Sequence, residues 1–150
     1  MILEINNFQV HYRSKRGTVH AVDGASLQVP EGQILGLVGE SGCGKTTTLR
    51  AILGLDTDFT GTVNFNKQEG GTGRVATVFQ EPRLLPWRSV EQNVRLAMPN
   101  SLQDQPLSNL FNELGIEHVK QFFPSELSLG LARRVALARA YALEPELLIL

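Results

Sequence analysis

The sequence predicts an α/β fold with a parallel sheet at its centre. Segments with strand and helix patterns alternate along most of the chain, as they do where helices connect parallel strands. Residues 34–38 (Ile-Leu-Gly-Leu-Val) form a continuous apolar run, which is typical of a strand buried on both faces. The chain has 150 residues, 42% of them hydrophobic, so it can build the core of one ordinary globular domain.

Two strands of an antiparallel edge sheet are expected at the N-terminus. Apolar and polar residues nearly alternate over residues 2–12 and again over residues 25–29. The Pro-Glu-Gly sequence at 30–32 is a turn signal that separates the second strand from the central apolar run.

The central run is followed by a helix over about residues 45–53. Two further strands are expected over residues 62–65 and 74–79, with glycine-rich turns around Gly61 and residues 70–73. These elements complete the strand and helix alternation of the first half of the chain.

The pattern changes after residue 82, where a helical insertion is expected. Residues 90–97 and 107–114 have apolar residues at helical spacing, and Pro99 and the polar residues 100–106 separate them. A longer helix over residues 129–143 follows, with Ser128 as its expected N-cap. Residues 147–150 form another apolar run that predicts a buried strand.

Composition excludes several classes of protein. Fourteen Lys and Arg against fifteen Asp and Glu give a net charge of −1, so we expect no nucleic-acid partner. No apolar run approaches a bilayer span and no signal peptide is recognisable, which favours a cytoplasmic protein that reaches a membrane through another protein. The single cysteine, Cys43, cannot form an internal disulfide.

A glycine-rich segment after the central apolar run has the pattern of a P-loop. Its residues, with the threonine after it, are Gly39, Glu40, Ser41, Gly42, Cys43, Gly44, Lys45, Thr46 and Thr47. The glycines let backbone amides point inward at an anion. Lys45, at the start of the helix, can reach the β- and γ-phosphates of ATP, and the Thr46 hydroxyl can ligate Mg²⁺. The Cys43 thiol is either a bystander in this loop or a nucleophile.

Past this segment, the order of motifs resembles the ATP-binding subunit of ABC transporters. Residues 78–82 (Val-Phe-Gln-Glu-Pro) resemble the Q-loop of that family, and residues 83–87 (Arg-Leu-Leu-Pro-Trp) resemble its nitrate, sulfonate and taurine importers. Residues 127–131 (Leu-Ser-Leu-Gly-Leu) align with the signature LSGGQ. Leu129 and Leu131 depart from that signature, which indicates a subfamily variant with altered contacts to nucleotide.

The resemblance implies roles for residues outside the P-loop. Tyr12 would stack on adenine, although a tyrosine at a strand end can simply be edge packing. Gln80 would contact Mg²⁺ and the attacking water. Ser128 and Gly130 would face the γ-phosphate bound on a second subunit. The tryptophan-bearing segment after the Q-loop would dock a membrane subunit or form part of the core of the insertion.

The resemblance also implies a domain plan, an incomplete P-loop NTPase core over residues 1–150. Residues 1–81 would be the nucleotide-binding core with its antiparallel edge sheet, residues 82–127 the helical insertion, and residues 128–150 the signature helix and the start of the Walker B strand. The family places its Walker B Asp, catalytic Glu and switch His after this strand, so we expect a truncated domain that hydrolyses ATP poorly. Surface or packing positions are expected for the histidines His11, His20 and His118.

The function implied is that of an importer ATPase. It would bind ATP and Mg²⁺, dimerise with a second ATP-binding subunit, and drive membrane permease subunits that receive solute from a periplasmic or extracellular solute-binding protein. Such a subunit lies at the inner face of the cell membrane. Two alternatives stay open: a nucleotide-binding or dimerising protein that never hydrolyses ATP, and an ABC ATPase without a role in transport.

Overall fold

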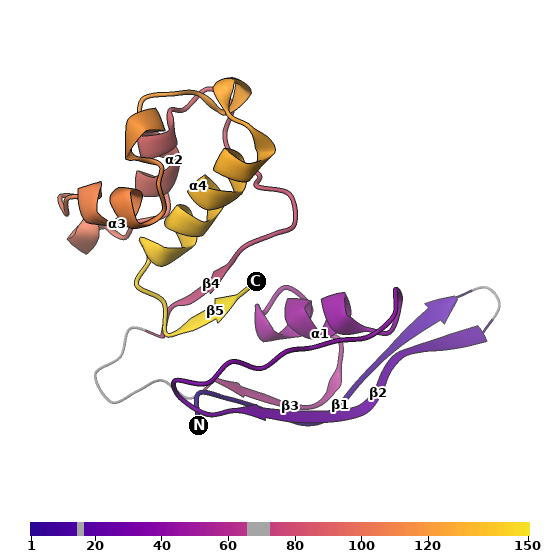
Figure 1. Cartoon of the computed structure of the whole chain (residues 1–150). Helices are drawn as coiled ribbons and strands as arrows, with labels where there is room; N and C mark the ends of the chain where they lie inside the picture. The colour runs from indigo at the N-terminus through magenta and orange to yellow at the C-terminus, as the bar shows by residue number, and fades with distance from the viewer. Residues whose placement is uncertain (15–16, 66–72) are drawn as a thin grey trace. The chain divides into compact units, whose positions relative to one another are not determined.

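The computed structural model describes residues 1–14, 17–65 and 73–150. The chain divides into two compact units, Met1–Gly73 and Arg74–Leu150, and each is described by itself (Figure 1). The predicted glycine-rich turn at residues 70–73 falls, apart from Gly73, outside the described residues.

The first unit contains a three-stranded antiparallel sheet. Its strands are β1 (Leu3–Ser14), β2 (Gly17–Val29) and β3 (Thr60–Phe65), in the order β2-β1-β3. β1 pairs with both neighbours, so that Leu3 lies opposite Val29 on one side and opposite Phe65 on the other. The predicted N-terminal antiparallel sheet is confirmed, and the second strand begins earlier than its sequence pattern indicated.

The core of this unit lies on one face of the sheet. Ile5, Phe8 and Val10 of β1 are at most 2% exposed. The pairing of β1 with β2 is irregular between Ile5 and Phe8, between Phe8 and Val10, and between Val10 and His11. The Phe8 and Phe59 rings pack with their centroids 5.1 Å apart. Helix α1 (Lys45–Ile52) lies over the sheet and contributes the buried residues Thr48 and Ala51 (Figure 1).

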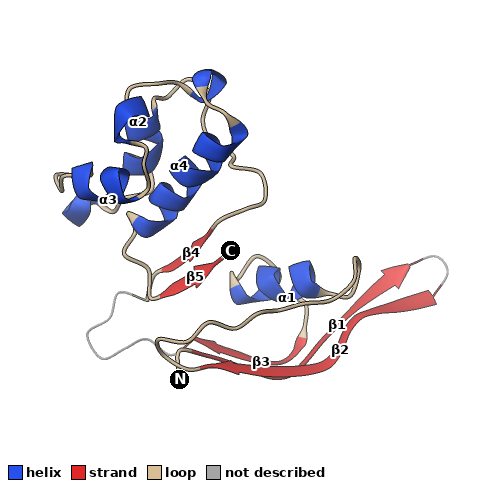
Figure 2. Cartoon of the chain, viewed as in Figure 1, coloured by secondary structure: helices blue, strands red, loops and turns tan. Residues whose placement is uncertain are grey.

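The strand predicted over residues 34–38 is not present. Residues 33–40 have no regular structure, as the tan trace in Figure 2 shows. Ile34 is 100% exposed and Val38 is 93% exposed. A strand buried on both faces depends on neighbours along both edges, and in the described parts of the chain this segment pairs with neither sheet. The prediction of a buried strand over residues 34–38 is therefore wrong.

The second unit combines a short parallel sheet with a helical cluster. Strands β4 (Val75–Thr77) and β5 (Leu147–Ile149) pair in parallel, which confirms both predicted strands. The helices between them are α2 (Val90–Arg95), η1 (Asn100–Leu102), α3 (Ser108–Glu113), η2 (Glu117–Val119), η3 (Pro124–Glu126) and α4 (Leu129–Tyr141).

The predicted helical spacings are confirmed by the packing of this unit. Val90 and Val94 from α2, Phe111 from α3 and Val135 from α4 are at most 1% exposed and belong to one cluster. β5 is only partly buried, so its prediction as a buried strand overstated its burial. In the described residues, no helix has the length and apolar character needed to cross a bilayer.

A single buried asparagine holds the segment that enters α2. Asn93 is 0% exposed, and its Oδ1 accepts a hydrogen bond from the Leu85 amide at 2.7 Å. Its Nδ2 donates to the carbonyls of Leu85 (3.1 Å), Arg88 (2.9 Å) and Ser89 (3.0 Å). Four backbone groups would lose this partner if the side chain were removed.

Asn93→Ala is expected to lower the free energy of unfolding by about 2–4 kcal/mol, because buried backbone groups would lose their partners. Urea unfolding followed by far-UV circular dichroism measures the change. Asn112→Ala, on the exposed face of α3, is the matched control and should change stability by less than about 0.5 kcal/mol. Equal effects of the two substitutions would contradict the structural role of Asn93.

Candidate nucleotide site

The loop before α1 turns sharply at two glycines. Gly42 has φ +85° and Gly44 has φ +89°, both in the left-handed region that a side chain disfavours. Gly44 is the N-cap residue of α1, and no side chain caps this end of the helix. The first turn of α1 therefore leaves amide groups and the positive end of the helix dipole for an anion.

Gly44 also brings the loop against strand β2. A Cβ atom at Gly44 would lie 2.4 Å from the Ala21 carbonyl oxygen and 2.7 Å from Cγ2 of Val22. Backbone cannot move aside as a flexible side chain can. The absence of a Cβ at residue 44 is therefore what lets α1 start at this point on the sheet.

Lys45 folds back onto the loop. Its Nζ donates to the carbonyls of Gly39 at 2.6 Å and Glu40 at 2.7 Å, and to the sulfur of Cys43 at 3.3 Å. Three polar groups of the loop thus gather around one ammonium. An anion entering the loop would meet a positive charge that is already positioned by the backbone.

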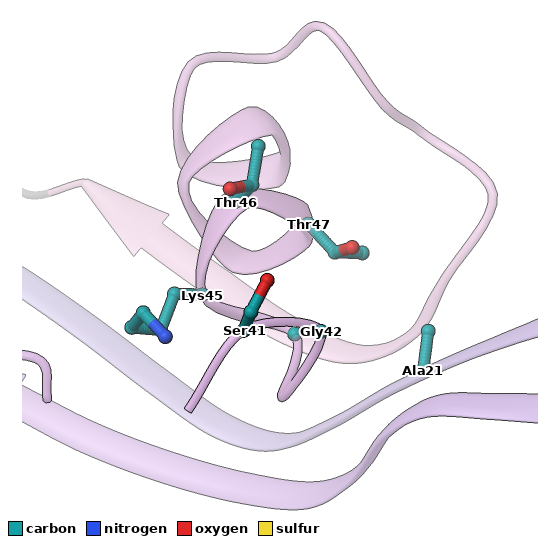
Figure 3. Close-up of a pocket in the computed structure, with 7 residues that line it drawn as sticks. Ala21, Ser41, Gly42, Lys45, Thr46 and Thr47 are labelled. Atoms are coloured by element: carbon teal, nitrogen blue, oxygen red, sulfur yellow. The ribbon is translucent and has the colours of Figure 1, made fainter. Parts of the chain in front are cut away.

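A cavity of about 340 Å³ opens beside this loop. Its lining consists of small or polar residues: Ala21, Ser41, Gly42, Gly44, Lys45, Thr46 and Thr47. Figure 3 shows them coming from the loop, from the first turn of α1 and from β2. The hydroxyl groups of Ser41, Thr46 and Thr47 and the ammonium of Lys45 can serve a polyanion and its cation.

Lys45 also changes the chemistry of the exposed cysteine. The hydrogen bond from its ammonium to the Cys43 sulfur lowers the pKa of the Cys43 thiol. A thiolate is the reactive form of cysteine. The lowered pKa therefore favours the thiolate form of Cys43 more than in an isolated cysteine.

The structure brings together most of the predicted P-loop residues. Gly39, Glu40 and Cys43 do not line the cavity but contact Lys45, which does. Tyr12 lies on β1 opposite Val19, is 46% exposed, and does not line the cavity.

Ala21 lines the cavity although no sequence pattern pointed to it. Ala21 lies in β2, far from the loop in sequence. Its place at the cavity follows from the close approach of Gly44 to its carbonyl, which the sequence does not indicate.

In the second unit, Gln80 is exposed, three residues beyond the end of β4.

The segment that follows Gln80 is held by the predicted signature helix. Arg139 of α4 donates to the carbonyls of Pro82 and Arg83, each at 2.9 Å. Burial lowers the pKa of Arg139. Arg83 in turn lies 4.5 Å from the centroid of the Phe79 ring. Sequence reasoning missed Arg139, because nothing in its spacing indicates a partner more than fifty residues away.

Ser128 caps the N-terminus of α4, as predicted. Its Oγ accepts a hydrogen bond from the Leu131 amide at 3.3 Å. Ser128 and Gly130 are both exposed. The two departures from the signature differ in environment: Leu129 is 59% exposed, whereas Leu131 packs against the hydrophobic cluster of this unit. A leucine at residue 131 thus contributes to the core.

Comparison with known proteins agrees with this arrangement. A family model described as "ABC transporter" matches residues 22–150. An aliphatic sulfonates import ATP-binding protein of Burkholderia lata is 45% identical over 127 residues, which cover 83% of this chain and 46% of that protein. One from Agrobacterium fabrum is 46% identical, covering 85% of this chain and 49% of that protein. The chain spans about half the length of these curated relatives.

Solved structures give the same fold. A dimeric ATP-binding cassette in a post-hydrolysis state, bound to ADP and Pi, is 25% identical with a TM-score of 0.79, covering 96% of this chain and 71% of that one. A Clostridium perfringens protein that is part of an ABC transporter complex is 27% identical with a TM-score of 0.77. The match covers 98% of this chain and 63% of that one. The predicted α/β fold class is confirmed.

Gly44→Ala is expected to destabilise the chain by about 2–5 kcal/mol, because it combines a strained φ with an overlap against the Ala21 carbonyl. Thermal unfolding measures the loss. Gly32→Ala is the control, since Gly32 has φ +70° but no atom within 4 Å of the place that a Cβ would take. The Gly32→Ala substitution should lower the free energy of unfolding by only about 1–2 kcal/mol. Similar losses for both variants would show that the contact with β2 has no energetic importance.

Proposed function

The chain belongs to the ABC transporter family, and on this premise we propose that it binds ATP in the cavity beside Lys45. The observation that carries the proposal is the convergence of the Lys45 ammonium, three hydroxyl side chains and an uncapped helix start on one cavity. A bound ADP and Pi in one structural neighbour supports a nucleotide ligand.

The residues of the loop fit a nucleoside triphosphate with Mg²⁺. Lys45 would exchange its carbonyl partners at Gly39 and Glu40 for phosphate oxygens, which are charged and so are stronger acceptors. Thr46 would hold the cation, and the family resemblance assigns Gln80 a contact with it. Mg²⁺, when bound, would neutralise charge on the phosphates. The cavity is proposed to hold the phosphates, and Tyr12 to stack on the base.

Lys45, Thr46 and Gln80 are proposed to take part in ATP hydrolysis. The family carries out ATP hydrolysis, and phosphoryl transfer to water depends on positioning and on charge stabilisation. The 150 residues supply Lys45, Thr46 and Gln80.

We assign the protein to import across a membrane, with the second unit as the partner-facing part. Ser128 and Gly130 at the exposed start of α4 would face the nucleotide of a second ATP-binding subunit. Trp87 is 70% exposed beside the Gln80 segment, which suits docking of a membrane permease better than a place in the core. The subunit would then lie at the cytoplasmic face of the membrane.

The solute is proposed to be an organic sulfonate. Several relatives at 39–46% identity carry the name aliphatic sulfonates import ATP-binding protein. Because permease and solute-binding subunits select the solute, this assignment rests on those names alone.

Lys45→Ala is expected to weaken ATP binding roughly 10- to 100-fold, the value of a lost charge-assisted hydrogen bond to phosphate. Equilibrium binding of a fluorescent ATP analogue, with unlabelled ATP as competitor, measures it. Lys120→Ala is the matched control, since it removes the same charge from an ion pair with Glu117 in the second unit. The affinity of the Lys120→Ala variant for ATP should equal that of the unmodified chain. Undiminished binding by Lys45→Ala would refute the proposed site.

The import assignment is tested in the source cell by replacing the Lys45 codon in the chromosome. Growth on an alkanesulfonate as the only sulfur source should be lost, while growth on sulfate should continue. The sulfate culture controls for a general growth defect. Growth on the sulfonate at the normal rate would contradict the solute assignment but leave ATP binding standing.

A further inference from the structure

Two histidines face each other across the first hairpin of the chain. His11 of β1 and His20 of β2 are register partners, and their ring centroids lie 4.1 Å apart with the rings inclined at 56°. Both side chains are exposed, and so is Asp23, three residues after His20. None of the three lines the nucleotide cavity.

An extra residue in β2 brings Asp23 to the same face as the histidines. Val10 pairs with Val22 and His11 pairs with His20, so Ala21 has no counterpart on β1. One unmatched residue is a β-bulge, which breaks the alternation of side chains along a strand. Val22 therefore stays on the buried face with Val10, and Asp23 joins the exposed face. Without the bulge, a residue three positions after His20 would point to the opposite face.

The donor atoms of these side chains lie close enough for one metal ion. Imidazole nitrogens of His11 and His20 and a carboxylate oxygen of Asp23 all lie within 4.8 Å of one another. Metal–ligand bonds of about 2.0–2.2 Å in a tetrahedral site would place such atoms roughly 3.5 Å apart. Exposed side chains can close this difference by small rotations.

We propose that His11, His20 and Asp23 form a binding site for a divalent transition metal, with Zn²⁺ as the reference ion. Two imidazoles and one carboxylate match the ligand preferences of Zn²⁺, Cu²⁺ and Ni²⁺ and do not match those of Mg²⁺ or Ca²⁺, which take oxygen ligands. Three protein ligands leave a fourth position for water. The site is thus chemically distinct from the Mg²⁺ position at Thr46.

The backbone of the site is preorganised by the sheet. His11 and His20 are held by the β1–β2 hydrogen-bond ladder, which fixes their Cα atoms. Binding therefore needs to order only three side chains, at a lower entropic cost than in a flexible segment. The metal would link the two strands directly at the bulge, so it should raise the melting temperature of the chain.

Zinc binding is measured on the full 150-residue chain without a histidine tag, kept reduced and freed of metal with a chelator. Isothermal titration with Zn²⁺ alone, without nucleotide, should give one ion per chain. His11→Ala and His20→Ala should each weaken binding at least about tenfold. The Cu²⁺ complex should show two nitrogen ligands in its electron paramagnetic resonance spectrum, and substitution of either histidine should remove one.

Two control variants separate this site from other metal ligands in the chain. His118 is an exposed histidine in the second unit and Cys43 is the only thiol. His118→Ala and Cys43→Ser should bind Zn²⁺ as the unmodified chain does. Circular dichroism of the His11 and His20 variants should match the unmodified chain, since these side chains are exposed.

The proposal is overturned if the unmodified chain binds no Zn²⁺ at micromolar concentration. It is also overturned if loss of His118 or Cys43 weakens binding as much as loss of His11 or His20. No nucleotide enters the measurement, so its failure would leave the proposed ATP site untouched.

Discussion

The close approach between the Gly44 backbone and the Ala21 carbonyl is the constraint on which the candidate site depends. Only a residue without a Cβ can take φ +89° at this distance from β2. The contact sets where α1 begins, and the start of α1 sets where its free amides and Lys45 point. A loop with the same glycine content elsewhere on the sheet would leave the phosphate groups unsupported.

Electrostatics then decides what the loop can hold. The Lys45 ammonium already lies among the Gly39 and Glu40 carbonyls, so a ligand must be a better acceptor than a neutral carbonyl. Phosphate oxygens meet this condition, whereas neutral solutes do not. The same ammonium lowers the pKa of the Cys43 thiol through its hydrogen bond to the sulfur.

Local patterns predicted the elements whose stability is local or whose apolar face has a neighbour. The Ser128 cap, the helix from Lys45 and the strand around Phe8 follow directly from residue type and spacing. The strand at residues 34–38 failed because apolar composition reports a tendency to be buried but cannot supply the paired neighbours that a buried strand needs. Ala21 and Arg139 could not be found in advance, because each acts through backbone partners distant in sequence.

The bulge at Ala21 affects both faces of β2 at once. On the buried side it keeps Val22 opposite Val10 while its carbonyl meets Gly44; on the exposed side it turns Asp23 toward the histidine pair. The support of the phosphate loop and the grouping of the metal-binding side chains therefore both involve the bulge at Ala21.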